Sequence, residues 1–276
     1  MLREMYDFGK GLAGVLGVMN RNRVKVWGHR GADGWDTRYA PENTLPSFRK
    51  AAEMGADGIE LDVQLSRDGA VVVCHDERID RTSDGSGFIG DFTLSELKHF
   101  SFSKLHPEYG FVDIPTLEEV LEFLQKNDLL LNIELKSGVM YYEGLEEKTL
   151  ALVKKYGLQD RVLYSSFNHY SLNKLHQLDA GAQLALLISH PGAVKNLAEY
   201  ARAVGGSSVT AIHPHYKHLD RNLVDYYHEC GMAVNTWTVD PIADMQRIAA
   251  MGVDGMITDC PDNGVAVVNE ICGVHK

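Results

Sequence analysis

The sequence predicts an α/β fold, a (β/α)₈ TIM barrel with a small inserted subdomain. Three observations lead to this expectation: the chain length, an alternation of short apolar runs with longer amphipathic ones, and a repeated glycine pattern. The chain has 276 residues, and one barrel domain of roughly 250 residues is common. Its composition, 45% hydrophobic and 24% charged, is that of a globular domain and excludes collagen, coiled coil and disorder.

Nine short apolar runs are candidate strands, because each has strand length and lies between turn residues or amphipathic segments. In chain order they are 24–27, 58–63, 70–74, 130–135, 162–165, 183–188, 209–212, 233–237 and 255–258. The second and third runs are too close for a parallel crossover, which needs about a dozen residues. We therefore expect those two runs to form a hairpin, which leaves eight parallel strands for the barrel.

Glycines recur where a helix should end and a strand begin. The pattern Met-Gly-x-Asp-Gly occurs around Gly55 and again around Gly252, with looser counterparts at Gly181 and Gly231. Each of these glycines is expected to close a helix in the left-handed conformation before a short turn. Four such caps indicate one repeated αβ architecture and not two unlike domains.

The chain is expected to have two further parts besides the barrel itself. Residues 76–115 are rich in turn residues and too long for an ordinary connection, so we interpret them as an inserted subdomain over one barrel end. Residues 1–23 are predicted to be an N-terminal arm or helix, packed on the domain of residues 24–276 or used as a subunit contact. Their apolar run, 11–19, is too short to span a bilayer and no small-residue cleavage site follows it.

Charge and cysteine content narrow the possible partners. Lysine and arginine number 27 and aspartate and glutamate 38, which gives a net charge of −11. Such a surface should repel nucleic acid and anionic membranes, so we expect no nucleic acid partner and no stable membrane insertion. The four cysteines are scattered without a CxxC pair, which favours a reducing, cytoplasmic location. A homo-oligomer remains an open alternative to a monomer.

Carboxylates gather in two candidate strands of the barrel. Glu60 and Asp62 are two residues apart and point to the same side of a strand, which is the barrel interior if Leu61 faces the helices. Glu134 lies at an equivalent strand end. Buried carboxylates are costly unless they bind a cation, and three hard oxygen donors suit Mg²⁺, Ca²⁺ or Mn²⁺. The alternative is a buried ion network with Arg30 and Lys136.

Two histidines are expected near these acids. His29 follows the first strand, and His75 follows the hairpin, which returns it to the level of Glu60. Two histidines beside a phosphate are suited to act as general base and general acid, because the imidazole pKa lies near neutrality. Arg30 and Lys136 offer cationic contacts to an anionic substrate.

These residues resemble the glycerophosphodiester phosphodiesterase family, whose barrel is of the phosphatidylinositol phospholipase C type. The resemblance extends over residues 24–261 and is specific as an ordered set. Its motifs are His29-Arg30-Gly31, Pro41-Glu42-Asn43-Thr44, Glu60-Leu61-Asp62-Val63, His75-Asp76, Arg81-Thr82, Ile114-Pro115-Thr116-Leu117, Glu134-Leu135-Lys136, Trp237-Thr238-Val239 and Ile257-Thr258-Asp259.

The resemblance implies hydrolysis of a glycerophosphodiester to sn-glycerol 3-phosphate and an alcohol, with a divalent metal ion, Mg²⁺ or Ca²⁺, as cofactor. It implies that Glu60, Asp62 and Glu134 hold the metal and that His29 and His75 are the catalytic pair. By the same resemblance, Arg30 and Lys136 contact the phosphate, Trp237 covers the glycerol, and Glu42 and Asn43 orient ligands or substrate.

Two rival functions stay open at this stage. A related barrel phospholipase would act on lysolipids and would need an exposed apolar rim. A catalytically silent metabolite-binding protein would lack one of the histidines or acids, and all are present here. The loop of residues 33–38 is longer than is usual in the family, and its Trp35 could stack on a choline-like cation or simply anchor the loop.

Overall fold

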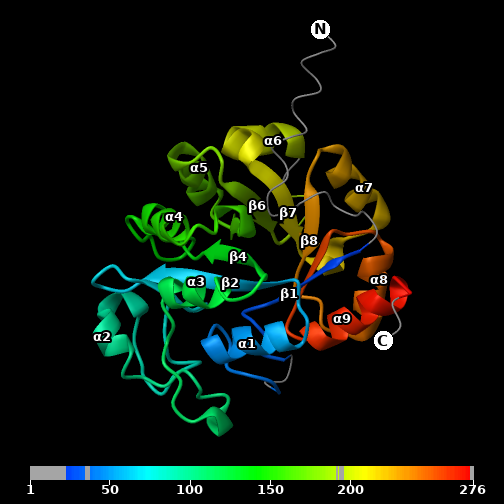
Figure 1. Ribbon diagram of the computed structural model, residues 1–276. Coiled ribbons are helices and arrows are strands. Elements are labelled where there is room, and N and C mark those ends of the chain that lie inside the picture. The colour runs from blue at the N-terminus through cyan, green and yellow to red at the C-terminus, as the bar shows by residue number, and fades with distance from the viewer. Residues whose placement is uncertain (1–22, 35–37, 191, 193–195, 274–276) are drawn as a thin grey trace.

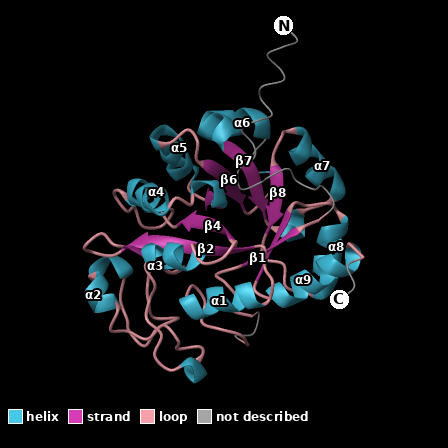
Figure 2. Ribbon diagram, in the orientation of Figure 1, coloured by secondary structure: helices cyan, strands magenta, loops and turns pink. Residues whose placement is uncertain are grey.

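The computed structural model describes residues 23–34, 38–190, 192 and 196–273, and it confirms the predicted barrel. The ring closes because β1 (Lys25–Gly28) pairs in parallel with both β9 (Gly255–Thr258) and β2 (Gly58–Leu65). Figures 1 and 2 show the helices arranged outside this ring of strands. The predicted arm of residues 1–23 lies outside the described residues except for Arg23, and so does Trp35.

The remaining elements alternate along the chain as the sequence predicts. The other barrel strands are β4 (Leu130–Leu135), β5 (Val162–Ser166), β6 (Gln183–Ile188), β7 (Val209–Pro214) and β8 (Ala233–Thr236). The helices are α1 (Leu45–Glu53), α2 (Leu94–Leu97), α3 (Leu117–Leu124), α4 (Leu145–Tyr156), α5 (His169–Leu178), α6 (Leu197–Gly205), α7 (Arg221–Glu229), α8 (Ile242–Ala250) and α9 (Pro261–Ile271). None of the described helices is long and apolar enough to cross a membrane.

The expected hairpin is confirmed. Strand β3 (Val71–Val73) pairs with β2 in the antiparallel sense, with Val63 opposite Val73. Strand β4 occupies one edge of β2 from Gly58 to Val63, so β1 and β3 share the other edge. The hairpin therefore carries the chain back across the C-terminal end of β2.

Three of the four predicted glycine caps are confirmed and one is wrong. Gly55, Gly231 and Gly252 have φ values of 82°, 79° and 77°, in the left-handed region where glycine is favoured. Gly181 is absent from the described residues with positive φ. There the chain leaves α5 through Asp179, whose Oδ1 accepts a hydrogen bond of 2.9 Å from the Gly181 amide, so the turn needs no left-handed residue.

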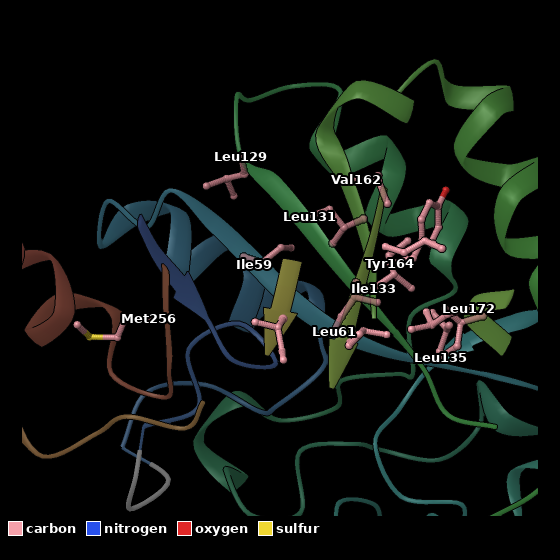
Figure 3. Close-up of a cluster of buried hydrophobic side chains, with 14 of the residues drawn as sticks. Ile59, Leu61, Leu129, Leu131, Ile133, Leu135, Val162, Tyr164, Leu172 and Met256 are labelled. Carbon is pink, nitrogen blue, oxygen red and sulfur yellow. The ribbon is translucent and has the colours of Figure 1, made fainter. Parts of the chain in front are cut away.

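The main core lies between the strands and the surrounding helices. Alternate residues of β2 and β4 face it, including Ile59, Leu61, Leu131 and Ile133, which Figure 3 shows side by side. Burial of these side chains supplies the principal stabilisation of the barrel. The opposite faces of the same strands point into the ring and carry the polar residues of the site.

The segment between β3 and α3 has a small apolar core of its own. Its buried members include Ile79, Ile89, Leu97 and Phe102, which pack with Val72 of the hairpin. Short 3₁₀ turns and the single turn of α2 connect them, so the segment has little regular structure. It appears below the ring in Figure 1, beside α1 and α3.

Candidate active site

The three predicted acids meet inside the C-terminal end of the barrel. Glu60 and Asp62 on β2 are buried, as the alternation of the strand predicts, and Glu134 on β4 lies opposite Asp62. One carboxylate oxygen from each of the three lies within 4.8 Å of the other two. This spacing lets a single cation touch all three carboxylates.

Both predicted cationic side chains lie against these acids. Lys136 Nζ is 2.9 Å from Glu134 Oε1 and 3.7 Å from Asp62 Oδ1, and Arg30 Nε is 3.6 Å from Asp62 Oδ2. The ion network considered as an alternative is therefore present around Asp62 and Glu134. Glu60 is connected to it through the backbone amide of Arg30, which is uncharged. Burial and the neighbouring charge of Asp62 raise the pKa of Glu60 to about 8. The three carboxylates of the cluster therefore outnumber the two cationic side chains beside them, Arg30 and Lys136.

Arg30 owes its position to an unusual backbone turn after β1. Its own φ is 49°, and its amide donates a 2.9 Å hydrogen bond to Glu60 Oε2. Gly31 follows with φ 92°, and a Cβ there would lie 2.1 Å from Ser47 Oγ. The same hydroxyl donates to the Arg30 carbonyl at 2.7 Å. Only glycine at position 31 lets the turn pack this closely on α1.

His29 is paired with a carboxylate from the last barrel strand. Its Nδ1 lies 2.6 Å from Asp259 Oδ1, which leaves Nε2 as the ring nitrogen available to a substrate. Burial by itself lowers the pKa of His29, but the charge and hydrogen bond of Asp259 outweigh it and raise the pKa to about 9. The carboxylate thus fixes the orientation of the ring and favours its protonated form.

His75 has a matching partner and a longer chain of ion pairs behind it. Its Nδ1 lies 2.7 Å from Asp76 Oδ1, and Arg81 Nε donates to Asp76 Oδ2 at 2.7 Å. Arg81 also holds Glu42 through Nη2 at 2.8 Å, and Arg30 reaches the same Glu42 oxygen at 2.9 Å. Glu42 is therefore buried between two arginines, behind the cleft and not in its wall.

Asn43 supports Asp62 from the side away from the cleft. Its Nδ2 donates a 2.8 Å hydrogen bond to Asp62 Oδ2, and its φ of 56° places it in the left-handed region. Despite burial, the nearby charges of His75, Lys136 and Arg30 keep the pKa of Asp62 below its ordinary value. This carboxylate is held ionised and in one orientation.

These groups line an open cleft of about 460 Å³, a volume that includes the solvent at its mouth. One side, here called the charged wall, consists of His29, Arg30, Glu60, His75 and Glu134. The other side, here called the apolar wall, consists of Phe167, Leu187, Trp237 and Ile257. Asn132 and Thr238 complete the lining. Six of the predicted site residues therefore line this cleft: His29, Arg30, Glu60, His75, Glu134 and Trp237. The other four do not line it but contact the lining side chains or one another: Glu42, Asn43, Asp62 and Lys136.

Trp237 belongs both to the apolar interior of the barrel and to the lining of the cleft. Its indole N–H donates to the His213 carbonyl at 2.7 Å, and its ring packs against the small apolar cluster inside the barrel. It also lines the cleft beside Thr238. The predicted strand over 233–237 ends one residue earlier, at Thr236, so strand alternation does not continue through the tryptophan.

Sequence reasoning gave no role to several residues that the structure places at the site. They are Asp76, Arg81, Asn132, Phe167, Leu187 and Asp259. Asp259 could have been found, because it directly follows a barrel strand, and such ends gather at one face. Nothing in the sequence shows that Phe167 and Leu187 face the cleft, since isolated apolar residues are ordinary core material.

A family model described as the glycerophosphoryl diester phosphodiesterase family matches residues 29–263. The chain belongs to this family. Two similar relatives bear the name glycerophosphodiester phosphodiesterase. One, from Caldanaerobacter subterraneus subsp. tengcongensis, is 41% identical over 90% of this chain and 99% of its own length. The other, from Bacillus altitudinis, is 37% identical over 90% of this chain and 99% of its own. Membership makes the protein a phosphoric diester hydrolase.

A solved structure extends the likeness to three dimensions. It is a phosphodiesterase from Oleispira antarctica in complex with the product sn-glycerol 3-phosphate, with a TM-score of 0.78 and 30% identity. The match covers 90% of this chain and 97% of that one. The predicted family and barrel are therefore both confirmed.

Proposed function

We propose that the protein hydrolyses glycerophosphodiesters, the deacylated forms of phospholipids, to sn-glycerol 3-phosphate and an alcohol, with the help of a divalent cation. The observation that carries this proposal is the cleft itself, which is lined by two carboxylates and by two carboxylate-supported histidines. The third carboxylate, Asp62, is buried within reach of the other two. The product named for the Oleispira antarctica structure supports the choice of substrate.

The residues fit a hard divalent cation. Glu60, Asp62 and Glu134 offer oxygen donors, and Asp62 Oδ1 is buried with no hydrogen-bond partner among the described residues. Mg²⁺, Ca²⁺ and Mn²⁺ all accept such a donor set. When bound, the ion would neutralise the acids and polarise the phosphoryl oxygens of the substrate.

The histidines are placed for proton transfer. With Nδ1 of each ring held by Asp259 or Asp76, Nε2 of His29 and of His75 can face the substrate. One takes the proton from the attacking hydroxyl, which is water or the 2-hydroxyl of the glycerol, and the other protonates the leaving alcohol. Arg30 and Lys136 contact the phosphate as it gains negative charge.

In this proposal the apolar wall binds the glycerol part of the substrate. Trp237 and Phe167 meet edge to face with ring centroids 5.4 Å apart and present carbon surface to the cleft. We place the glycerol carbons against these rings, opposite the charged wall. The inserted segment of residues 76–115 then lies toward the leaving alcohol, where it would set the head-group preference. A cytoplasmic location stays part of the proposal.

The test is release of glycerol 3-phosphate from glycerophosphocholine, glycerophosphoethanolamine and glycerophosphoglycerol, each with Mg²⁺, Ca²⁺ and Mn²⁺. We expect turnover of at least one substrate and its loss on chelation. If none of the nine combinations yields glycerol 3-phosphate, the proposal fails.

A further inference from the structure

The hairpin that carries His75 leaves the ring of strands before it reaches the site. Strand β2 pairs with β4 only as far as Val63, and its last two residues pair with β3 alone among the described strands. Strand β3 itself ends at Val73, and residues 74–77 form no helix or strand. The hydrogen bonds between the barrel strands therefore do not fix the backbone at His75.

Three consecutive carbonyl groups of this segment share one side-chain donor. Gln64 Nε2 donates to the carbonyl oxygens of Cys74 and His75 at 2.9 and 3.1 Å. It also donates to the carbonyl oxygen of Asp76 at 2.8 Å. In the described part of the chain, no backbone amide donates to any of these three oxygens. The amide of Gln64 is therefore the principal hydrogen-bond donor to the main chain of residues 74–76.

Gln64 stands on the same face of β2 as two acids of the carboxylate cluster. It follows Glu60 and Asp62 at intervals of two residues, so strand alternation directs all three side chains to one side. The side chain of Gln64 is fully buried, and it is not among the side chains that line the cleft. Gln64 thus contacts the backbone of His75 and not the space where the substrate is placed.

A tyrosine fixes which end of this amide meets the carbonyl groups. Tyr142 lies in the loop between β4 and α4, and its hydroxyl donates to Gln64 Oε1 at 2.7 Å. Burial raises the pKa of Tyr142, so the hydroxyl keeps its proton and acts as the donor. Because Oε1 accepts that proton, both N–H groups of Nε2 are left for the carbonyl oxygens of residues 74–76.

The main chain held in this way carries the pair formed by His75 and Asp76. The two residues are neighbours in the chain, so the 2.7 Å contact between Nδ1 and Oδ1 depends on the backbone angles that join them. Arg81 Nε holds the other oxygen of the Asp76 carboxylate at 2.7 Å. Arg81 therefore restrains the carboxylate of the pair, and Gln64 restrains the backbone from which both side chains start.

We propose that Gln64 is a positioning residue for the reaction and that Tyr142 supports it, because together they hold the main chain of residues 74–76 and keep the His75 ring at the cleft. The inference rests on the proposed function, in which His75 transfers a proton. A general acid or base acts only from hydrogen-bonding distance, and a displacement of about 1 Å can cost about 10²-fold in rate. Loss of the Gln64 amide should therefore lower kcat through His75 and leave substrate and metal binding intact.

The experiment measures kcat, KM and metal content per chain, with the glycerophosphodiester and the metal that give wild type its highest turnover. Gln64→Met keeps the length of the side chain and removes the amide, and Tyr142→Phe removes only the hydroxyl. Each substitution is made in the wild-type chain and in His75→Ala. The control is Tyr227→Phe, which removes a buried hydroxyl that has no hydrogen-bond partner among the described residues.

We expect Gln64→Met to lower kcat by about 30- to 100-fold and Tyr142→Phe by about 3- to 10-fold, with KM and metal content unchanged. In His75→Ala neither substitution should lower the residual kcat further, because the ring that they position is absent. Tyr227→Phe should leave kcat unchanged in both backgrounds.

Two further measurements keep the test decisive. Melting temperatures show whether each variant is folded, and if Gln64→Met is not, Tyr142→Phe decides by the same comparisons. If His75→Ala has no measurable turnover, NMR spectra of histidine-labelled protein replace the comparison of backgrounds. The ring signals of His75, identified by their absence from His75→Ala, should then shift in Tyr142→Phe and not in Tyr227→Phe, and unshifted signals would refute the positioning role.

Four outcomes overturn the inference. Normal kcat in folded Gln64→Met and Tyr142→Phe does so and leaves the proposed function standing. An equal fractional loss of kcat with and without the His75 ring would make the amide a support of the whole cleft. Loss of bound metal, or a rise in KM at constant kcat, would show that Gln64 acts on metal or substrate binding instead. If wild type cleaves no glycerophosphodiester with any of the three metals, the proposed function fails and this inference fails with it.

Discussion

The pKa of a histidine inside the barrel shifts in opposite directions in the two halves of the ring of strands. His29, in the half that carries the charged wall, is paired with Asp259, and its pKa rises to about 9 although burial alone would lower it. His213 on β7, in the half that carries the apolar wall, has Nε2 3.0 Å from Asn235 Nδ2, and among the described residues no carboxylate contacts its ring. Burial lowers the pKa of His213 to about 3.

This contrast shows that depth of burial does not decide the chemistry of a side chain in this protein. Burial by itself lowers the pKa of both rings, although the His29 side chain stays 19% exposed at the cleft. At His29 the charge and hydrogen bond of Asp259 reverse the direction of the pKa shift. In the proposed function the charged half transfers protons and binds the cation, whereas the apolar half offers shape and carbon surface. The effects of substitutions on activity and stability should therefore differ between the two halves, both in the property affected and in the size of the change.

The largest effect is expected from the carboxylate cluster. Glu60→Gln or Glu134→Gln keeps the volume and removes a charged donor, so metal binding and activity should be lost together, with kcat lower by about 10³-fold or more. Metal content per chain and kcat are the measurements, and the melting temperature should change little. Glu53→Gln, at an exposed site on α1, is the matched control. Unchanged metal stoichiometry in both cluster variants would contradict the assignment.

The histidines of the charged half should come next. His29→Ala and His75→Ala are each expected to lower kcat by roughly 10²- to 10⁴-fold, the usual contribution of one positioned acid or base. The wild-type pH profile of kcat should be bell-shaped, with one limb lost in each variant. His213→Ala serves as the comparison, because its ring is buried and is not among the side chains that line the cleft, so the substitution should not move either limb. A His75→Ala enzyme with normal kcat would exclude His75 from the reaction.

The supporting carboxylates should have a smaller effect than the rings they hold. Asp259→Asn and Asp76→Asn keep a hydrogen-bonding partner but remove the charge that fixes the tautomer, so kcat should fall by about 10- to 100-fold with little change in KM. Steady-state kinetics separate the two constants. A rise in KM with constant kcat would show that these residues act on substrate binding instead.

A substitution at Trp237 tests the role of the apolar wall in substrate binding. Trp237→Ala should lower kcat/KM about tenfold for every glycerophosphodiester alike, because it removes carbon surface from the glycerol side of the cleft. Its cost in unfolding free energy should stay below that of Trp27→Ala, where a fully buried ring is lost at about 3 to 5 kcal/mol. Chemical denaturation of both variants gives the comparison. A changed head-group preference in Trp237→Ala would mean that the substrate lies in the opposite direction.

The smallest effect is a pH dependence of stability that comes from His213. The unfolded ring takes up a proton near pH 6.5 and the folded ring only near pH 3, so acid favours unfolding between these values. This residue should remove about 1 kcal/mol of unfolding free energy between pH 7 and pH 5.5. His213→Gln should lose that part of the slope, measured by urea denaturation at several pH values. An identical slope in both proteins would show that His213 titrates normally when folded.

The strands of this protein could be predicted from its sequence, because the spacing of apolar residues and the length of the links between apolar runs are local properties. The nine apolar runs became nine strands, and the short link of residues 66–69 was enough to reveal the hairpin. Strand ends shifted by one or two residues, as at Thr236, where hydrogen bonding to a neighbouring strand and not composition sets the limit. The cap expected at Gly181 failed because Asp179 satisfies the turn with its side chain.

The acids and histidines of the charged half were also identifiable from the sequence. Charged residues at strand ends are conspicuous in an apolar pattern, and barrel geometry brings strand ends together. The apolar wall was not identifiable, because Phe167 and Leu187 resemble any core residue until the ring of strands shows which face they occupy.

By itself, the sequence determined the barrel, its hairpin and the set of groups able to bind a cation and transfer protons. Only the tertiary structure decided which carboxylate supports each histidine, that Glu42 lies between Arg30 and Arg81 behind the cleft, and that Phe167 and Leu187 belong to its apolar wall. The physical reason is that these contacts join residues far apart in the chain, such as His29 and Asp259. Their distances depend on how the ring closes, which no local pattern records.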